Sequence, residues 1–326
     1  MQRKSLGVLL LAVLVLGGLF AWLQRGGEGA RQGARPPLLP ALQGRVEQVR
    51  ALEIRHGELP EIRIELRDGR WLVPAKAGYP AAAGEVNRLL HALAEAHKVE
   101  AKTANPANHA RLGLAEQGEG AATRLTLEGL TAQPLNLLIG QPSQQGGQLV
   151  RLAGDDQVWV IDQSLQLVDN ELAWLDRRIA RIPFASVRAL EVRQADGAQL
   201  DLWRDTPEQA NLAVRQLLAG RSLAYPAAAD GMASLFAVLD FADAAPLAQV
   251  GFEGRPELEF SLHTFNGALL RGAFYQRGGQ HWLLLGENRG LDGLLIGSPD
   301  WAYRVEEAQY RVLAKRLNEL LEAPKS

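Results

Sequence analysis

The heptapeptide VRALEIR at Val49–Arg55 occurs a second time, with one change, as VRALEVR at Val187–Arg193. Two further pairs follow in the same order: YPAAA at Tyr79–Ala83 and Tyr225–Ala229, then GGQ at Gly146–Gln148 and Gly278–Gln280. Any one of these matches could arise by chance in a chain rich in alanine and leucine. Three colinear pairs instead predict a duplicated structural unit whose loops differ in length.

Alternating polarity predicts strands at the start of each repeat. Within Ile62–Leu66, apolar and charged residues alternate, which gives one buried and one solvated strand face. Asp68-Gly69 then supplies a two-residue hairpin turn, and Asp196-Gly197 supplies one in the second repeat. Hairpins outnumber crossovers, so we expect mainly antiparallel sheets.

Helices are expected after each YPAAA motif and at the end of the chain. The apolar residues at helical spacing are Val86, Leu89, Leu90 and Leu93, then Met232, Leu235, Phe236 and Leu239, and finally a stripe within about Val305–Leu321. Each stripe suits a helix that covers one face of a sheet. The sequence therefore predicts an α+β fold of two duplicated β-rich units, residues 46–182 and 183–326, each sheet covered by helices.

The N-terminus has the pattern of a membrane anchor. Arg3 and Lys4 precede an uncharged run of 18 residues, Leu6–Leu23, with Trp22 near its far end. A helix of that length just spans a bilayer core, and tryptophan favours the headgroup layer. We expect a single-pass transmembrane signal anchor at residues 1–23, with a cleaved signal peptide as the alternative.

Residues 24–45 are rich in glycine, arginine and proline and lack periodicity, which predicts a flexible linker. The rule that relates basic residues to orientation gives close to a tie. A short basic tail, an apolar run and a large following body favour export of that body. We therefore expect the protein at the bacterial inner membrane, with its C-terminal body in the periplasm.

Composition excludes several classes of function. The chain of 326 residues carries 35 basic and 37 acidic side chains, a net charge of −2, so it lacks the basic excess of nucleic-acid-binding proteins. It contains no cysteine, which excludes disulfides, thiolate nucleophiles and thiolate metal sites. We expect membrane proteins as partners and no nucleic acid.

The sequence indicates no catalytic residue, no cofactor and no metal site. His91 and His97 are six residues apart on a predicted helix and point in different directions, and the other histidines are isolated in sequence. Neither a serine elbow nor a phosphate-binding loop occurs in a strand context. Two acidic groups, Asp155-Asp156 and Glu253 with Glu257 and Glu259, are better explained as turn residues and as the solvated face of a strand.

Four tryptophans lie in strand-like runs: Trp71, Trp159, Trp203 and Trp282. Packing in the core is the preferred interpretation, and a stacking platform for sugar rings is the alternative.

The order of several motifs resembles the bacterial family catalogued as domain of unknown function 4340. These motifs are the N-terminal anchor, RDGRW at Arg67–Trp71, a helix ending near Val99, RLGL at Arg111–Leu114, LLIG at Leu137–Gly140 and VWVID at Val158–Asp162. The resemblance covers about Val46 to Trp282. It implies a membrane-anchored protein, often encoded beside ABC-type transport components similar to those of gliding-motility systems, with no family catalytic residues to carry over.

Together these observations predict a non-catalytic, membrane-anchored accessory or scaffold protein of the bacterial envelope, associated with an ABC-type transport complex. The tether supports this prediction, because it keeps the body close to other membrane proteins. The alternative is an extracytoplasmic envelope hydrolase or a glycan-binding module.

Overall fold

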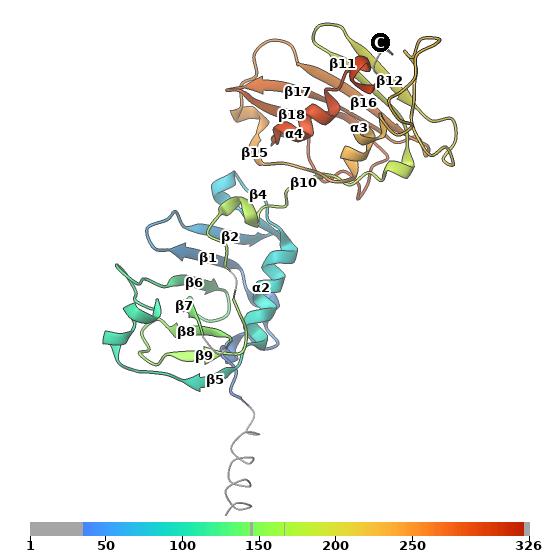
Figure 1. Cartoon of the computed structure of the whole chain (residues 1–326). Coiled ribbons are helices and arrows are strands. Elements are labelled where there is room, and N and C mark those ends of the chain that lie inside the picture. Colours follow the sequence, from blue (N-terminus) through green and yellow to red (C-terminus); the bar gives the residue numbers. More distant parts are fainter. Residues whose placement is uncertain (1–34, 144–145, 166, 323–326) are drawn as a thin grey trace, which may run out of the picture. The chain divides into compact units, whose positions relative to one another are not determined.

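A computed structural model describes residues 35–143, 146–165 and 167–322 (Figure 1). The expected anchor at Leu6–Leu23 and the first part of the linker lie outside these residues. Within the described part of the chain, no helix is long and apolar enough to cross a membrane. The described residues form two compact units, one of residues 35–48 and 89–165 and the other of residues 49–88 and 167–322.

The first large sheet has nine strands in the order β4-β3-β2-β1-β6-β7-β8-β9-β5. Its strands are β1 (Ala51–His56), β2 (Ile62–Arg67), β3 (Arg70–Val73), β4 (Tyr79–Pro80), β5 (Lys98–Ala101), β6 (Thr123–Glu128), β7 (Leu135–Pro142), β8 (Gln148–Leu152) and β9 (Trp159–Ile161).

The second large sheet has eight strands in the order β13-β12-β11-β16-β17-β18-β19-β15, and every neighbouring pair is antiparallel. Its strands are β11 (Val187–Gln194), β12 (Gln199–Trp203), β13 (Ala213–Val214), β15 (Asp243–Pro246), β16 (Leu258–Thr264), β17 (Leu269–Arg277), β18 (Gln280–Arg289) and β19 (Trp301–Val305). A small sheet pairs β10 (Arg178–Ala180) with β14 (Leu239–Asp240).

Helices are few and short in the described part of the chain. The α-helices are α2 (Ala83–Glu95), α3 (Asp230–Ser234), α4 (Glu307–Leu313) and α5 (Leu317–Leu320). The 3₁₀ helices are η1 (Pro40–Leu42), η2 (Val46–Gln48), η3 (Pro74–Lys76), η4 (Pro106–Asn108), η5 (Ala110–Leu112), η6 (Glu171–Trp174), η7 (Phe184–Ser186), η8 (Leu235–Ala237) and η9 (Leu247–Gln249).

The predicted α+β class with helix-covered sheets is therefore wrong. Antiparallel sheets dominate the described residues, and the helices do not cover them. The stripe after Tyr225 forms a five-residue helix and one 3₁₀ turn, and Leu239 already belongs to β14. The predicted C-terminal helix is split between β19, α4 and α5. Short apolar runs fit a buried strand as well as a helix, so spacing alone misassigned them.

The two large sheets share one strand order. Without β4, the first sheet runs β3-β2-β1-β6-β7-β8-β9-β5, and each position in the second sheet is taken by the strand numbered ten higher. Even the hairpin register agrees, because Ala51 lies opposite Glu65 as Ala189 lies opposite Trp203. The common order supports a shared origin of the two sheets.

The repeated motifs occupy matching positions in this order. Ala51–Glu53 of the first VRALE motif lie on β1 and the whole second motif lies on β11, each YPAAA leads into an α-helix, and each GGQ ends at the first residue of β8 or β18. The two Asp-Gly turns do not match, since Asp68-Gly69 joins β2 to β3 and Asp196-Gly197 joins β11 to β12.

Candidate functional site

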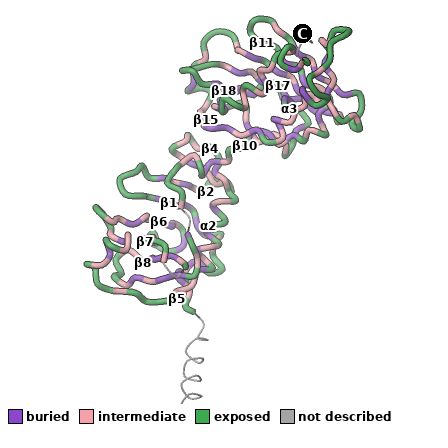
Figure 2. Tube along the Cα trace, in the orientation of Figure 1, coloured by how far each residue is buried: buried purple, intermediate pink, exposed green. Residues whose placement is uncertain are grey.

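One face of the second sheet is solvated. On β11 the side chains of Leu190 and Val192 are buried, whereas Glu191 and Arg193 point to the exposed side. The same alternation continues on β16, with Phe260 buried and its strand neighbours more exposed. Figure 2 shows buried, intermediate and exposed stretches along the chain in this part of the protein. An antiparallel sheet tolerates this arrangement because one packed face suffices to stabilise it.

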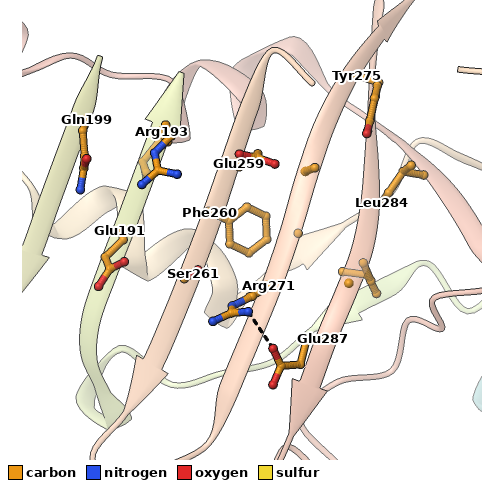
Figure 3. A pocket seen from close by; sticks show the side chains of 15 residues that line it. Glu191, Arg193, Gln199, Glu259, Phe260, Ser261, Arg271, Tyr275, Leu284 and Glu287 are labelled. Atoms are coloured by element: carbon orange, nitrogen blue, oxygen red, sulfur yellow. Dashed lines mark ion pairs between the residues drawn. The ribbon is translucent and has the colours of Figure 1, made fainter. Parts of the chain in front are cut away.

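This solvated face contains a groove of about 610 Å³ (Figure 3). Its lining comes from β11, β12, β16, β17 and β18. Small side chains at Ser261 and Ala273, together with Gly286, lie among longer charged ones, so the middle of the sheet surface is lower than its surroundings. The groove is thus a product of side-chain size on adjacent strands.

Strand register places the charged groups of the groove. Arg193 lies directly opposite Glu259, and Glu191 lies opposite Ser261, across the β11–β16 pair. Directly opposed residues in an antiparallel pair have Cβ atoms about 5 Å apart. Arg271 follows opposite Ser261 on β17.

The charged groups of the groove differ in how they are paired. Arg271 and Glu287 form an ion pair at 2.8 Å between Nη1 and Oε2, with both side chains about half exposed. Among the described residues, none forms a hydrogen bond or ion pair with the side chains of Glu191, Arg193 or Glu259. The groove therefore presents two carboxylates and one guanidinium to solvent.

An aromatic cluster stands next to the groove. Phe252 packs on Tyr275 at 5.1 Å between ring centroids and on Trp282 at 6.3 Å. All four tryptophans that were expected in the core, namely Trp71, Trp159, Trp203 and Trp282, are only half-buried. Two of them accept cations on their rings, Trp159 from Lys98 at 4.8 Å and Trp203 from Arg215 at 5.5 Å.

The acidic groups named from the sequence are not brought together. Asp155 accepts a hydrogen bond from the backbone of Gln157, as expected of a turn residue. Glu257 pairs with the buried His281, whereas Glu259 lies in the groove and Glu253 is exposed in a loop. No pair of carboxylates arranged for acid–base catalysis results from either acidic group.

A polar cluster around His281 could not be found from the sequence. The Nδ1 atom of His281 lies 3.0 Å from Glu257 Oε2, and Nε2 lies 2.9 Å from Glu307 Oε2. The imidazole also stacks on Tyr310 at 3.6 Å. Glu307 and Tyr310 come from α4, so the cluster fastens this helix to β18.

Ionisation within this cluster follows from burial and pairing. Burial, assisted by the Glu257 carboxylate, raises the pKa of Tyr310 to about 12. A hydrogen bond from Arg311 lowers the pKa of Glu307, and the neighbouring His281 lowers it further.

Within the described residues, no group of three or more His, Cys, Asp or Glu side chains could hold a metal ion.

A buried arginine positions the start of β11. The guanidinium of Arg204 donates to the backbone carbonyls of Phe184 at 2.6 Å and Ala185 at 3.1 Å, and its Nε donates to Val187 at 3.0 Å. The side chain is only 3% exposed, and burial lowers its pKa. Arg204 therefore fixes the strand from which Glu191 and Arg193 project.

The model of one family, Domain of unknown function (DUF4340), matches residues 71–230, which is just under half of the chain. The resemblance noted from the motifs is thereby confirmed over residues 71–230. The match begins in β3 and ends in α3, so it includes the Glu191 and Arg193 side of the groove but not β16–β18. No curated protein and no solved structure matches the chain.

Proposed function

We propose that this chain is a non-catalytic accessory protein of the bacterial envelope that holds a component of an ABC-type transport complex through the groove on the second sheet. The observation that supports it is the set of unpaired charged side chains, Glu191, Arg193 and Glu259, on an open sheet face. Charged side chains that have no partner within the protein contribute little to its stability, but they can recognise a binding partner that carries complementary charges. The class of partner rests on the family resemblance alone.

The proposed location is the inner membrane, with the body in the periplasm. It is supported by the uncharged run Leu6–Leu23 and by the composition of residues 24–45. The C-terminal part of the predicted linker is not flexible but belongs to the folded body, because Leu38, Leu39 and Leu42 are buried and the backbone N–H of Leu38 donates to the carbonyl of Ala96. A flexible segment of residues 24–35 would span on the order of 20 Å between its ends, which raises the effective concentration of the body near membrane partners. Alkaline phosphatase fused after Ser326 should be active, and an inactive fusion beside an active cytoplasmic reporter would contradict this location.

A pull-down from native membranes in mild detergent tests the partner class. The full-length protein should recover a permease and an ATPase. Ser261→Trp fills the groove floor and should abolish this recovery, whereas Gln276→Trp, which adds the same ring at an exposed β17 position outside the lining, should not. A wild-type protein that never recovers transport components would refute the proposal.

Glycan binding is the second candidate, and the cluster of Phe252, Tyr275 and Trp282 beside the groove favours it. This alternative predicts a protein that stays alone in the pull-down and binds a defined oligosaccharide. Recovery of transport proteins supports the accessory function, and recovery of the protein alone together with oligosaccharide binding supports glycan binding.

A further inference from the structure

We infer that the groove binds an extended polypeptide segment of the partner in which a basic and an acidic side chain alternate along one face, with basic groups in excess. This inference rests on the proposed function and adds the chemistry of the bound segment. It follows from a comparison of the same strand pair in the two sheets, then from the spacing of the free charges.

In the first sheet, the glutamate of the VRALE motif is neutralised within the protein. Glu53 on β1 lies opposite Arg63 on β2, and the two side chains form an ion pair. Arg63 also contacts Glu65 at 2.6 Å, and Glu65 contacts Arg67 at 2.5 Å. The corresponding surface is therefore occupied by a chain of alternating internal ion pairs.

In the second sheet, the partner of the same glutamate is a carboxylate. Glu191 on β11 lies opposite Asp201 on β12, at the position that Arg63 takes in the first hairpin. Like charges directly opposed across two strands are unfavourable. Asp201 accepts a hydrogen bond from the Gln199 amide at 2.9 Å, but the amide brings no charge. A cation from outside the protein would restore the balance that Arg63 supplies in the first sheet.

The free charges also have the spacing of an extended chain. Glu191 and Arg193 are two residues apart on one strand, which places their Cα atoms about 6.6 Å apart on the same face. Side chains two residues apart in an extended ligand have the same spacing. A basic residue followed two positions later by an acidic one therefore meets Glu191 and Arg193 together, and Glu259, which lies opposite Arg193 on β16, adds a second negative charge beside them.

The charged side chains without partners in the groove favour a peptide over a sugar as the bound ligand. The rings that could stack on a pyranose, Tyr275 and Trp282, each contact Phe252, and they carry no charge. The groups without partners are two glutamate carboxyl groups and a guanidinium, and a neutral oligosaccharide supplies no side chain of opposite charge to them. A peptide with alternating charges satisfies them.

Fluorescence anisotropy with the full-length protein in detergent micelles tests the inference. The probe is the labelled peptide acetyl-Ser-Lys-Ala-Glu-Ala-Lys-Ser amide, and its charge-reversed counterpart is acetyl-Ser-Glu-Ala-Lys-Ala-Glu-Ser amide. The first peptide should bind more tightly, and Glu191→Gln or Glu259→Gln should each weaken it about threefold, as expected for one exposed charge pair. Glu208→Gln, in an exposed loop outside the groove, should leave binding unchanged.

Three outcomes would overturn the inference: equal binding of the two peptides, displacement of the first peptide by an N-acetylglucosamine tetramer, or no effect of either groove variant. These outcomes are independent of the pull-down. If Ser261→Trp loses the transport proteins but the probe peptide does not bind, the proposed function stands and the peptide chemistry fails. If the probe binds the groove but no transport protein is recovered, the peptide chemistry stands and the proposed function fails.

Discussion

The paired GGQ motifs offer a test in which the same substitution meets two different surroundings. Gly147 and Gly279 have φ angles of +81° and +75°, so alanine is strained at both positions. A Cβ on Gly147 would lie 2.0 Å from the carbonyl oxygen of Ile161, whereas a Cβ on Gly279 meets nothing within 4 Å. Comparison of Gly147→Ala with Gly279→Ala therefore separates backbone strain from the clash.

The expected magnitudes follow from these two terms. A left-handed conformation of a residue with a Cβ costs roughly 1–2 kcal/mol, which should be the whole effect of Gly279→Ala. Gly147→Ala must in addition move the end of β9 away from Gln148, the residue that pairs with Ile161. Overpacking of this kind typically costs about 1–3 kcal/mol more, so Gly147→Ala should lower the free energy of unfolding by roughly 2–5 kcal/mol.

Hydrogen exchange measured by mass spectrometry reports the two hairpins separately in the full-length protein. Gly147→Ala should speed exchange in β8 and β9 and leave β17 and β18 as in the wild type. Gly279→Ala should cause a smaller change, confined to the β17–β18 hairpin. Equal losses of protection in the two variants would show that the close approach of Ile161 to Gly147 does not govern stability there.

Three other changes have outcomes set by the geometry. His281→Gln removes the stack on Tyr310 and one of two carboxylate contacts, and urea unfolding should show a loss of about 2–3 kcal/mol. Burial raises the folded-state pKa of Tyr310 from its ordinary value of 10.0 to about 12, so the stability that this difference contributes is complete below about pH 10 and falls as the pH rises toward 12. Tyr310→Phe should lessen this alkaline loss of stability. Arg204→Met should lower the free energy of unfolding by about 2–3 kcal/mol, because the carbonyl of Val187 loses its guanidinium donor and that of Phe184 keeps only the backbone N–H of Val187, and a change below 0.5 kcal/mol would contradict that role.

Strands were predictable where alternation and turn chemistry agree. Ile62 and Ile64 are buried on β2 with charged residues between them, as the pattern requires. Asp68 and Gly69 both adopt positive φ angles, 50° and 76°, in the turn that follows. Such positions are settled by a few neighbouring residues, so the sequence is sufficient to identify them.

The helix prediction after Tyr225 is wrong because its apolar residues are buried against the sheet and not along one face of a continuous helix. Phe236 lies at helical spacing from Met232, yet it belongs to a 3₁₀ turn and packs on Phe260 at 5.1 Å. Met232 and Phe236 are both fully buried, as their hydrophobicity predicts. The helical spacing of the apolar residues does not predict the observed conformation of this segment. Tertiary packing decided the local conformation.

The groove was only partly accessible to sequence reasoning. Glu191 and Arg193 are on the solvated face by simple alternation within VRALEVR, and Glu259 was noted as a residue of a solvated face. Their proximity depends on the β11–β16 register, which joins strands separated by more than sixty residues. No local pattern encodes that pairing. The ion pair of Arg271 with Glu287 instead joins β17 to β18, the two strands of one hairpin.

The difference between the two hairpins leads to the last prediction, Asp201→Arg. This change reproduces at β12 the charge that Arg63 supplies at β2, so the new guanidinium should pair with Glu191. Relief of the opposed carboxylates should raise the free energy of unfolding by about 0.2–1 kcal/mol. Binding of the probe peptide with two lysines should weaken at least threefold, since Glu191 would no longer need an external cation.

Asp205→Arg is the matched control, because it makes the same change of charge just after β12 at an exposed position outside the groove lining. If both variants weaken peptide binding equally, the net charge of the protein governs binding and the groove does not. If Asp201→Arg destabilises the sheet, then Asp201 is already balanced within the protein. The motif shared by the two hairpins would in that case serve only to build strands, and the difference between Arg63 and Asp201 would have no bearing on binding.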